Sequence, residues 1–232
     1  MPYPITTPRS DASLLAAANA SALPKTVFWD RIARKYAADP IADIAGYVAT
    51  LQRVQALLSV DHDVLEIGCG TGSTALRLAP GTRTLMATDI SSGMIAIARE
   101  KLAVRPVPQL SFAVADADAA VFGKEVYDAV LAFNLLHLVD DLDRTIAVAI
   151  RSLKPGGLFI SKTARIRKMN PLVAWLALPL VRAIGKAPHV LCLDGDRLQS
   201  AIAHQGLEIL SVERHGIRGK DIRVFIVARK PA

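Results

Sequence analysis

Short apolar runs alternate along this chain with longer stretches in which apolar and polar residues recur at helical spacing. Runs of four to seven mostly apolar residues, bounded by turn residues, are typical of buried strands, and the longer periodic stretches are typical of amphipathic helices. The alternation of the two predicts an α/β protein in which helices cover both faces of a largely parallel sheet. The expected strands are 64–67, 85–88, 110–115, 127–133, 158–163, 207–213 and 222–228.

Turn chemistry sets the expected direction of the last two strands. Gly216 and Gly219 leave room for only a short connection between them, so the final strand is predicted to run antiparallel to its predecessor. Earlier in the chain, the segment LKPGG at 153–157 is predicted to be a turn, because Pro155 stops a helix and the glycines lead into the strand at 158–163. The fold expected is a doubly wound, seven-stranded, mostly parallel sheet.

The first strand ends in a loop with three glycines at alternate positions, Gly68, Gly70 and Gly72. Glycines at a strand end let a ligand approach the backbone closely, which is typical of a nucleotide-type site, although an ordinary tight turn has the same composition. The dinucleotide fingerprint places its third glycine three residues after the second, and Ser73 stands there. An oxidoreductase that binds a nicotinamide dinucleotide is therefore disfavoured.

Acidic side chains close the next two strands. Asp89 ends the second strand, with Ser91 placed to cap the following helix, and Asp116 follows the third strand. A carboxylate at the end of the second strand can accept hydrogen bonds from both hydroxyls of a ribose. Since the carboxyl ends of parallel strands share one edge, polar groups are predicted to gather there.

With these motifs the chain resembles the class I S-adenosylmethionine-dependent methyltransferases, especially the bacterial small-molecule branch that includes quinone-biosynthesis enzymes. The resemblance covers about residues 28–230 and rests on five motifs in family order: VLEIGCGTG, ATDIS, AVADAD, FNLLHLVDD and LKPGG. It implies a Rossmann-like methyltransferase fold, methyl transfer from S-adenosylmethionine, and S-adenosylhomocysteine as product.

The resemblance also implies a set of cofactor contacts. The glycine loop would wrap the methionine moiety, the second-strand acid would hold the ribose, and the residues after the third and fourth strands would meet the adenine and lie below the sulfonium. In addition, one aromatic of the amino-terminal helices would close the methionine end. The residues concerned are Glu66, Gly68, Cys69, Gly70, Gly72, Asp89, Ile90, Met94, Asp116, Ala117, Phe133, Asn134 and Tyr36.

A catalytic base is optional in such a transfer, because a sulfonium already carries an activated methyl group. His137 is the nearest candidate for removing a proton from the acceptor, and the alternative is that it begins the next helix and forms only local hydrogen bonds. His189 is a second, weaker candidate. Trp29 is expected to be a core residue rather than part of a cap.

The acceptor is predicted to be a small apolar or amphipathic molecule. Asn134 is followed by Leu135, Leu136 and His137, whereas nucleic-acid amino-methyltransferases of this fold carry two prolines and an aromatic there, and cytosine enzymes carry a Pro-Cys pair. An RNA-directed methyltransferase, a nucleotide-binding oxidoreductase and a non-catalytic cofactor-binding protein stay open as alternatives.

Composition adds few constraints. The 232 residues are 52% hydrophobic and carry a net charge of +7, but apart from a cluster at 165–168 the basic residues are scattered, which makes nucleic acid a poor partner. Cys69 and Cys192 form neither a disulfide framework nor a metal motif, so no metal is expected and a reducing cytoplasm is the simplest location.

The expected organisation is a flexible leader at 1–24 followed by one methyltransferase domain at 25–232. Two amphipathic helices within 27–58 precede the first strand as a cap, and 165–190 form a helical insertion. The apolar core of that insertion, 171–181, is too short to span a bilayer. It is expected to be a lid over the acceptor, with a buried helix and an interfacial helix touching a membrane through 165–184 as alternatives.

Overall fold

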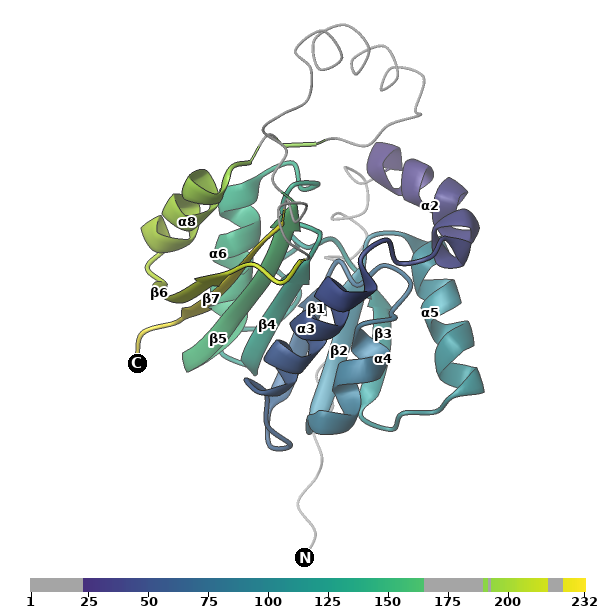
Figure 1. Ribbon diagram of the computed structural model, residues 1–232, viewed down its shortest axis with the longest axis horizontal. Helices are drawn as coiled ribbons and strands as arrows, with labels where there is room; N and C mark the ends of the chain where they lie inside the picture. The colour runs from purple at the N-terminus through teal and green to yellow at the C-terminus, as the bar shows by residue number, and fades with distance from the viewer. Residues whose placement is uncertain (1–22, 165–189, 192, 217–222) are drawn as a thin grey trace, which may run out of the picture.

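The computed structural model describes residues 23–164, 190–191, 193–216 and 223–232. Seven strands form one sheet in the order β3-β2-β1-β4-β5-β7-β6 (Figure 1). All neighbouring strands are parallel except β7, which is antiparallel to both β5 and β6. The strand bounds are β1 Asp63–Ile67, β2 Thr84–Asp89, β3 Leu110–Val114, β4 Tyr127–Phe133, β5 Leu153–Ala164, β6 Glu208–Glu213 and β7 Arg223–Arg229. The doubly wound sheet and its antiparallel final strand, both predicted from the sequence, are confirmed.

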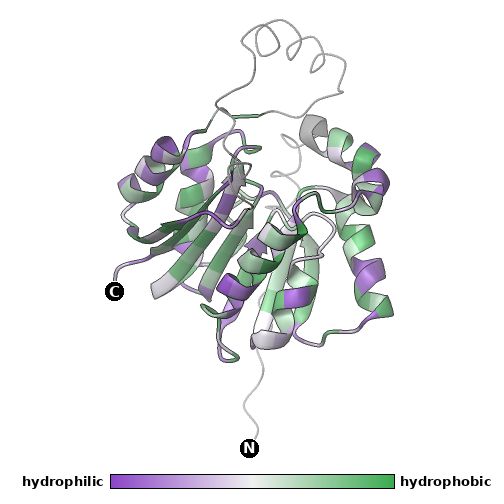
Figure 2. Cartoon of the chain, in the orientation of Figure 1, coloured by the Kyte–Doolittle hydropathy of each residue, from purple (hydrophilic) through white to green (hydrophobic). Residues whose placement is uncertain are grey.

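Helices cover both faces of this sheet and meet it in two separate hydrophobic clusters. Along β1 the side chains alternate, so that Val64 joins one cluster and Leu65 and Ile67 join the other. The first cluster includes residues of α3, α4 and α5, and the second includes residues of α6 and α8. The central strands are accordingly hydrophobic on both sides (Figure 2). The helices are α2 Leu23–Ala38, α3 Ile44–Gln55, α4 Ala75–Leu78, α5 Ser92–Val104, α6 Leu142–Ser152 and α8 Gly195–His204, with a short 3-10 turn η1 Ala79–Gly81.

Side-chain caps fix where several helices begin. Asp43, Ser91, Asp141 and Asp194 each accept a hydrogen bond from the backbone amide three residues ahead. The cap predicted at Ser91 is therefore confirmed. Asp43 caps α3, the second of the two helices predicted within 27–58.

The segment LKPGG was wrongly predicted to be a turn. It belongs to β5, which starts at Leu153 immediately after α6 and pairs there with Tyr127 across an irregularity in register. Gly156 adopts a positive φ of 76°, and its amide donates to the carbonyl of Lys230 at 2.9 Å. Pro155 and the glycines thus bend the first residues of β5, and they do not separate the strand from α6.

Two expected segments lie outside the described residues: the leader at 1–24, apart from the start of α2, and the insertion at 165–190, apart from its last residue. His189, within the insertion, and Cys192, just after it, also lie outside the described residues. Within the described part of the chain, no helix combines the length and hydropathy needed to cross a membrane.

Candidate functional site

A cavity of about 1200 Å³ opens at the carboxyl edge of the parallel strands. The loops that follow β1, β2, β3 and β4 form its floor, and α2 with the loop before α3 forms one side. Ligands of open α/β sheets bind at this edge, where the strand order reverses between β1 and β4. The fold therefore places the cavity where its chemistry was expected.

The three glycines after β1 all adopt positive φ but face different surroundings. A Cβ atom at Gly68 would lie 2.6 Å from the Leu135 side chain, and one at Gly72 would lie 2.6 Å from Phe112. Among the described residues beyond its chain neighbours, a Cβ atom at Gly70 would meet only Cε1 of Tyr36 within 4 Å, at 3.8 Å, so this position opens into the cavity. Gly68 and Gly70 line the cavity, whereas Gly72 packs against the core and is not among the lining residues.

Asp89 is held at the end of β2 by two backbone amides. Its carboxylate accepts hydrogen bonds from Gly70 N and Ser91 N, both at 2.9 Å. Burial raises the pKa of Asp89, and the charges of Asp30 and Asp116 add to this effect against the two amide bonds. Asp89 thus links the glycine loop to the start of α5 and presents an acid to the cavity.

Glu66 is a buried acid in the wall of the cavity. Its side chain lies on the α3 face of the sheet, and its Oε2 is buried without a hydrogen-bond partner among the described residues. Burial, followed by the charge of Asp89, raises the pKa of Glu66 to about 8. A buried, unsatisfied acceptor beside a second acid is costly unless a donor or a cation occupies the cavity.

The rest of the glycine loop is held from outside the cavity. Lys101 of α5 donates to the carbonyl of Thr71 at 3.0 Å, to its hydroxyl at 2.8 Å and to the hydroxyl of Ser73 at 2.9 Å. Cys69 also lines the cavity, but burial and the neighbouring acids raise the pKa of its thiol well above the usual value. The thiol is therefore protonated and poorly suited to act as a nucleophile.

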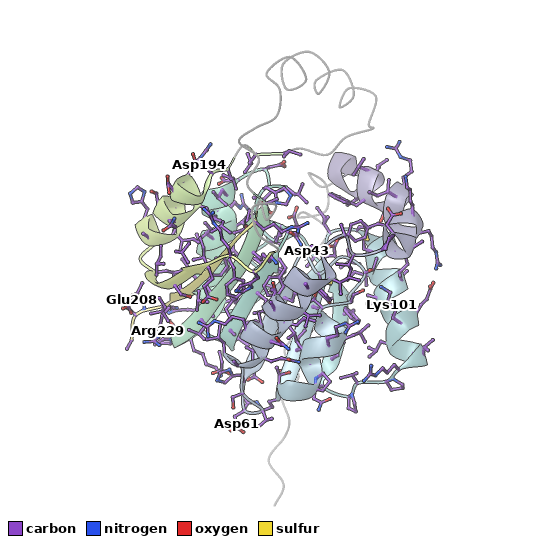
Figure 3. The ribbon with its side chains drawn as sticks, viewed as in Figure 1. Asp43, Asp61, Lys101, Asp194, Glu208 and Arg229 are labelled. Atoms are coloured by element: carbon purple, nitrogen blue, oxygen red, sulfur yellow. The ribbon has the colours of Figure 1, made fainter. Side chains whose placement is uncertain are left out.

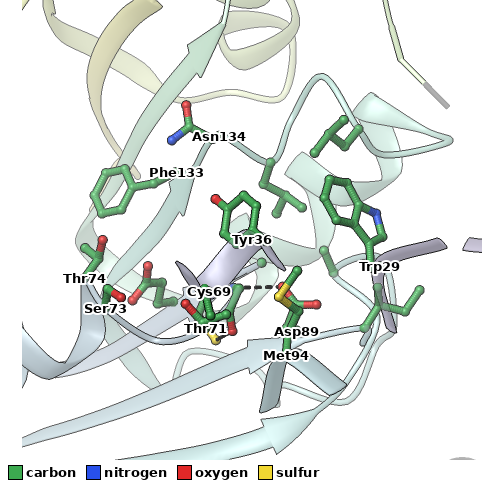
Figure 4. Close-up of a pocket in the computed structure, with 18 of the residues that line it drawn as sticks. Trp29, Tyr36, Cys69, Thr71, Ser73, Thr74, Asp89, Met94, Phe133 and Asn134 are labelled. Atoms are coloured by element: carbon green, nitrogen blue, oxygen red, sulfur yellow. Dashed lines mark hydrogen bonds between the residues drawn. The ribbon is translucent and has the colours of Figure 1, made fainter. Parts of the chain in front are cut away.

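Helix α2 covers the cavity with two aromatic side chains. Trp29 packs beside Ala33, Met94 and Ile97 and also lines the cavity, so the expected core role describes only part of its position. Tyr36, which is half exposed, lies between Phe133 and Asn134 on one side and Asp89 and Met94 on the other (Figure 4). Burial, and then the charge of Asp89, raises the pKa of Tyr36.

The loop after β4 forms the opposite part of the floor. Asn134 adopts a positive φ of 53°, and its backbone amide donates to the carbonyl of Lys162 at 2.7 Å. Asn134 lines the cavity beside Phe133. His137 lies in a turn before α6 rather than at a helix start, and it is not among the lining residues. Burial, followed by the charge of Arg223, lowers the pKa of His137.

Most of the predicted site residues come together. The cavity includes every predicted cofactor contact except Gly72, and it leaves out His137. Sequence reasoning missed Tyr47, Thr71, Thr74 and Arg223, which also line it. Arg223 could have been found, because the first residue of an antiparallel strand lies at the same edge as the last residues of its parallel neighbours.

Comparison with solved structures supports this fold. An S-adenosylmethionine-dependent methyltransferase from Mesorhizobium loti superposes with a TM-score of 0.63 at 18% identity, over 78% of this chain and 98% of that one. At this identity the likeness concerns the fold alone.

Sequence comparison identifies the family. Residues 64–157 match the model of a methyltransferase domain family. The chain is 30% identical over 130 residues to the ubiquinone/menaquinone biosynthesis C-methyltransferase UbiE of Geobacter sulfurreducens. The aligned region covers 53% of this chain and 50% of that protein. These matches support a class I S-adenosylmethionine-dependent methyltransferase.

The methyltransferase segment also resembles parts of much larger proteins. It is 36% identical over 126 residues to the lovastatin nonaketide synthase mokA of Monascus pilosus, which covers 51% of this chain and 4% of that protein. The match thus spans half or less of each of these two curated relatives. The family's cofactor is S-adenosylmethionine, a cation, and a cavity with a buried, unsatisfied carboxylate suits it.

Proposed function

We propose that this methyltransferase transfers the methyl group of S-adenosylmethionine to a small acceptor with a largely apolar body. The observation that carries the proposal is the cavity, whose volume of about 1200 Å³ exceeds the roughly 300–1,000 Å³ typical of a site for one small molecule. It therefore has room for a cofactor and an acceptor together. Its walls combine an acidic end with apolar side chains such as Val27, Ile41, Leu135 and Leu138.

At the acidic end we propose that the chain binds the cofactor through Asp89, Asp116 and the Gly70 backbone. The Asp89 carboxylate, already oriented by two amides, would accept from the ribose hydroxyls, and Asp116 with the Ala117 backbone would accept from and donate to the adenine. Ile90 and Met94 would pack on the ring. The carboxylate of Glu66 would gain the positive partner that the described residues do not supply.

The bound cofactor supplies an activated methyl group on a sulfonium. This chain would orient the methyl donor and the acceptor and would exclude water from them. Phe133 and Asn134 form the floor beside the glycine loop, and Tyr36 and Trp29 cover the cavity from α2. His137 as a base stays a prediction. Its lowered pKa keeps the imidazole neutral and able to accept a proton, but it stands behind the lining residues rather than among them.

We also propose a small-molecule acceptor over RNA, a cytoplasmic location, and one domain over 25–232 with the insertion at 165–190 next to the acceptor. The support for the acceptor class is the cavity itself, whose lining is partly apolar and contains a single cation, Arg223, among the described residues. The relatives named above are a ubiquinone/menaquinone biosynthesis C-methyltransferase and a lovastatin nonaketide synthase, and neither name refers to RNA.

Calorimetric titration with S-adenosylmethionine, S-adenosylhomocysteine and NAD tests the cofactor end. Asp89→Ala removes a charge-assisted acceptor, so we expect affinity for the first two to fall by about 2 to 3 kcal/mol. Asp61→Ala is the matched control, since Asp61 is an exposed carboxylate before β1, at the opposite edge of the sheet (Figure 3). Equal affinities for wild type and Asp89→Ala, or preferential binding of NAD, would contradict the proposal.

Turnover tests the rest of the proposal. Wild-type protein incubated with S-adenosylmethionine and a panel of phenols, quinones and lipids should produce S-adenosylhomocysteine with at least one acceptor class. Cofactor binding without turnover on any member would instead support a non-catalytic cofactor-binding protein.

A further inference from the structure

The acceptor end of the cavity contains one feature that the cofactor chemistry does not use. Among the described residues that line the cavity, Arg223 is the only cation, while Asp39, Glu66, Asp89, Asp116 and Asp140 are acids. We infer that Arg223 selects the acceptor by binding an acidic oxygen, a carboxylate or a phenolate, on an otherwise apolar molecule. The inference rests on the proposed function and adds to it the chemical class of the acceptor.

Strand register places Arg223 far from the acids that serve the cofactor. Arg223 begins β7 and pairs with Ala164 of β5, while Lys162 of β5 pairs with Phe133 of β4. Across the sheet, β2 with Asp89 is followed by β1, β4, β5 and then β7. Strands lie about 4.8 Å apart and rise about 3.3 Å per residue, and Arg223 lies two residues beyond the level of Phe133 and Asp89, so its backbone stands about 20 Å from that of Asp89 and about 12 Å from that of Phe133. Arg223 therefore lines the part of the cavity that lies across the floor residues from Asp89, the part that the proposed function leaves to the acceptor.

The field of Arg223 is felt by the residues around that end. Its charge is the second cause, after burial, that lowers the pKa of His137. The same charge opposes the effects of burial and Asp89 on Tyr36. Tyr36 belongs to α2 and His137 to the turn after β4, so the charge of Arg223 acts on both of these elements.

The chemistry of a guanidinium suits this role. Five N–H donors in a planar fork can hold a carboxylate through two parallel hydrogen bonds and still serve a partner within the protein. Apolar side chains such as Leu135 and Leu138 line the same cavity and reduce competition from water, which strengthens a charged contact. The same side chains would favour the apolar body of the acceptor, so the lining of the cavity suits an amphipathic acid.

Binding of a matched pair of probes tests the inference without the natural acceptor. Protein saturated with S-adenosylhomocysteine is titrated with 1-naphthoate, with 1-naphtholate generated at alkaline pH, and with the neutral amide 1-naphthamide. We expect wild type to bind naphthoate or naphtholate at least about 10-fold more tightly than the amide. Which of the two anions is preferred distinguishes a carboxylate from a phenolate.

Three variants separate selection from structure. In Arg223→Gln the preference for the anion should fall to within about twofold, and Arg223→Lys should retain part of it because the charge stays but the fork is lost. Arg229→Gln is the matched control, an arginine at the other end of the same strand, near Glu208 and away from the cavity (Figure 3). Its preference should match that of wild type.

Several outcomes would overturn the inference. One is an equal affinity of wild type for the anions and the amide, or no measurable binding of any anion. Another is an unchanged preference in Arg223→Gln. A loss of S-adenosylhomocysteine affinity in Arg223→Gln would assign the guanidinium to the carboxylate of the cofactor instead. Failure of wild type to bind S-adenosylhomocysteine at all would refute the proposed function itself, which keeps the two failures distinct.

Discussion

At the scale of single residues, the three glycines after β1 show why a motif alone does not identify contacts. All three have a backbone conformation that side chains rarely adopt, but only Gly70 faces open space in the cavity. Gly72 is needed for packing against Phe112 and Ala98. The alternate spacing predicted the loop, whereas the neighbours of each glycine come from strands and helices that the loop sequence does not contain.

This difference gives a paired prediction. Gly70→Val should abolish binding of S-adenosylhomocysteine, because its side chain would fill the cavity, while the positive φ costs about 1 kcal/mol of stability. Gly72→Ala should lower stability by about 2 to 4 kcal/mol, because the new Cβ would lie 2.6 Å from Phe112. Calorimetric titration and thermal melting on both variants check this. Normal binding by Gly70→Val would show that the loop is only a structural turn.

The acids of the site were predictable for a related reason. A carboxylate that ends a parallel strand must lie at the carboxyl edge, so Asp89 and Asp116 followed from the pattern of strands. The buried state of Glu66 did not, because it depends on helices packed over β1. Arg223 did not follow from the same rule, because it begins an antiparallel strand, and such a strand brings its first residue and not its last to the carboxyl edge.

At the scale of elements, helix α2 is fastened to α5 by a pair of hydrogen bonds at the start of α5 and by an ion pair farther along. Asp30 of α2 accepts from the Ser91 hydroxyl at 2.6 Å and from the Gly93 amide at 2.8 Å, at the start of α5. A carboxylate at a helix N-terminus is favoured by the exposed amides and by the helix dipole. The second contact is the ion pair between Arg34 and Glu100, which is largely exposed to solvent.

We therefore expect Asp30 to hold the cap over the cavity and Arg34 to matter little. Asp30→Ala should increase hydrogen exchange across α2 and weaken S-adenosylhomocysteine binding about 5-fold or more, since Tyr36 and Trp29 depend on the position of this helix. Arg34→Ala, the control on the same helix, should change either quantity by less than about 1 kcal/mol. Equal effects of the two variants would show that α2 is not fastened through Asp30.

Element boundaries were predicted less well than element types. The strand 127–133 was predicted with its observed bounds, because a run of apolar residues between turn residues has one interpretation. The error at LKPGG arose because Pro155 and two glycines usually interrupt structure, while here hydrogen bonds with Lys230, the residue after the last strand, hold the segment within β5. Long-range pairing of this kind leaves no local signal. The insertion at 165–190, with its Trp175, stays a prediction.

At the scale of the whole molecule, two sets of carboxyl groups make stability depend on pH in opposite directions. Hydrogen bonds from Arg83 lower the pKa of Asp63 to about 2. Partial burial alone would raise the pKa of Glu213, but hydrogen bonds from Arg53, Ser211 and His215 lower it to about 2. The stability that these two acids contribute is present above their ordinary pKa and is lost as the pH falls toward 2.

Glu66 acts in the opposite sense, since its pKa rises from the ordinary 4.5 to about 8 in the folded protein. Between these values the folded state binds a proton that the unfolded state has released, so the free energy of unfolding decreases as the pH rises. Glu66→Gln mimics the protonated carboxyl. In the absence of cofactor it should therefore match wild type near pH 5 and become more stable by on the order of a few kcal/mol near pH 8.

Thermal melting of wild type, Glu66→Gln and Glu213→Gln from pH 3 to 8.5 measures both effects on one molecule. The Glu213→Gln variant should show the mirror image: a loss of stability at pH 5 to 8 that shrinks as the pH falls toward 3, because the ion pair with Arg53 weakens as the acid becomes protonated. If the difference between Glu66→Gln and wild type did not change with pH, Glu66 would be ionised in the folded protein. Its unpaired oxygen would then have a donor or a cation as partner beyond the described residues.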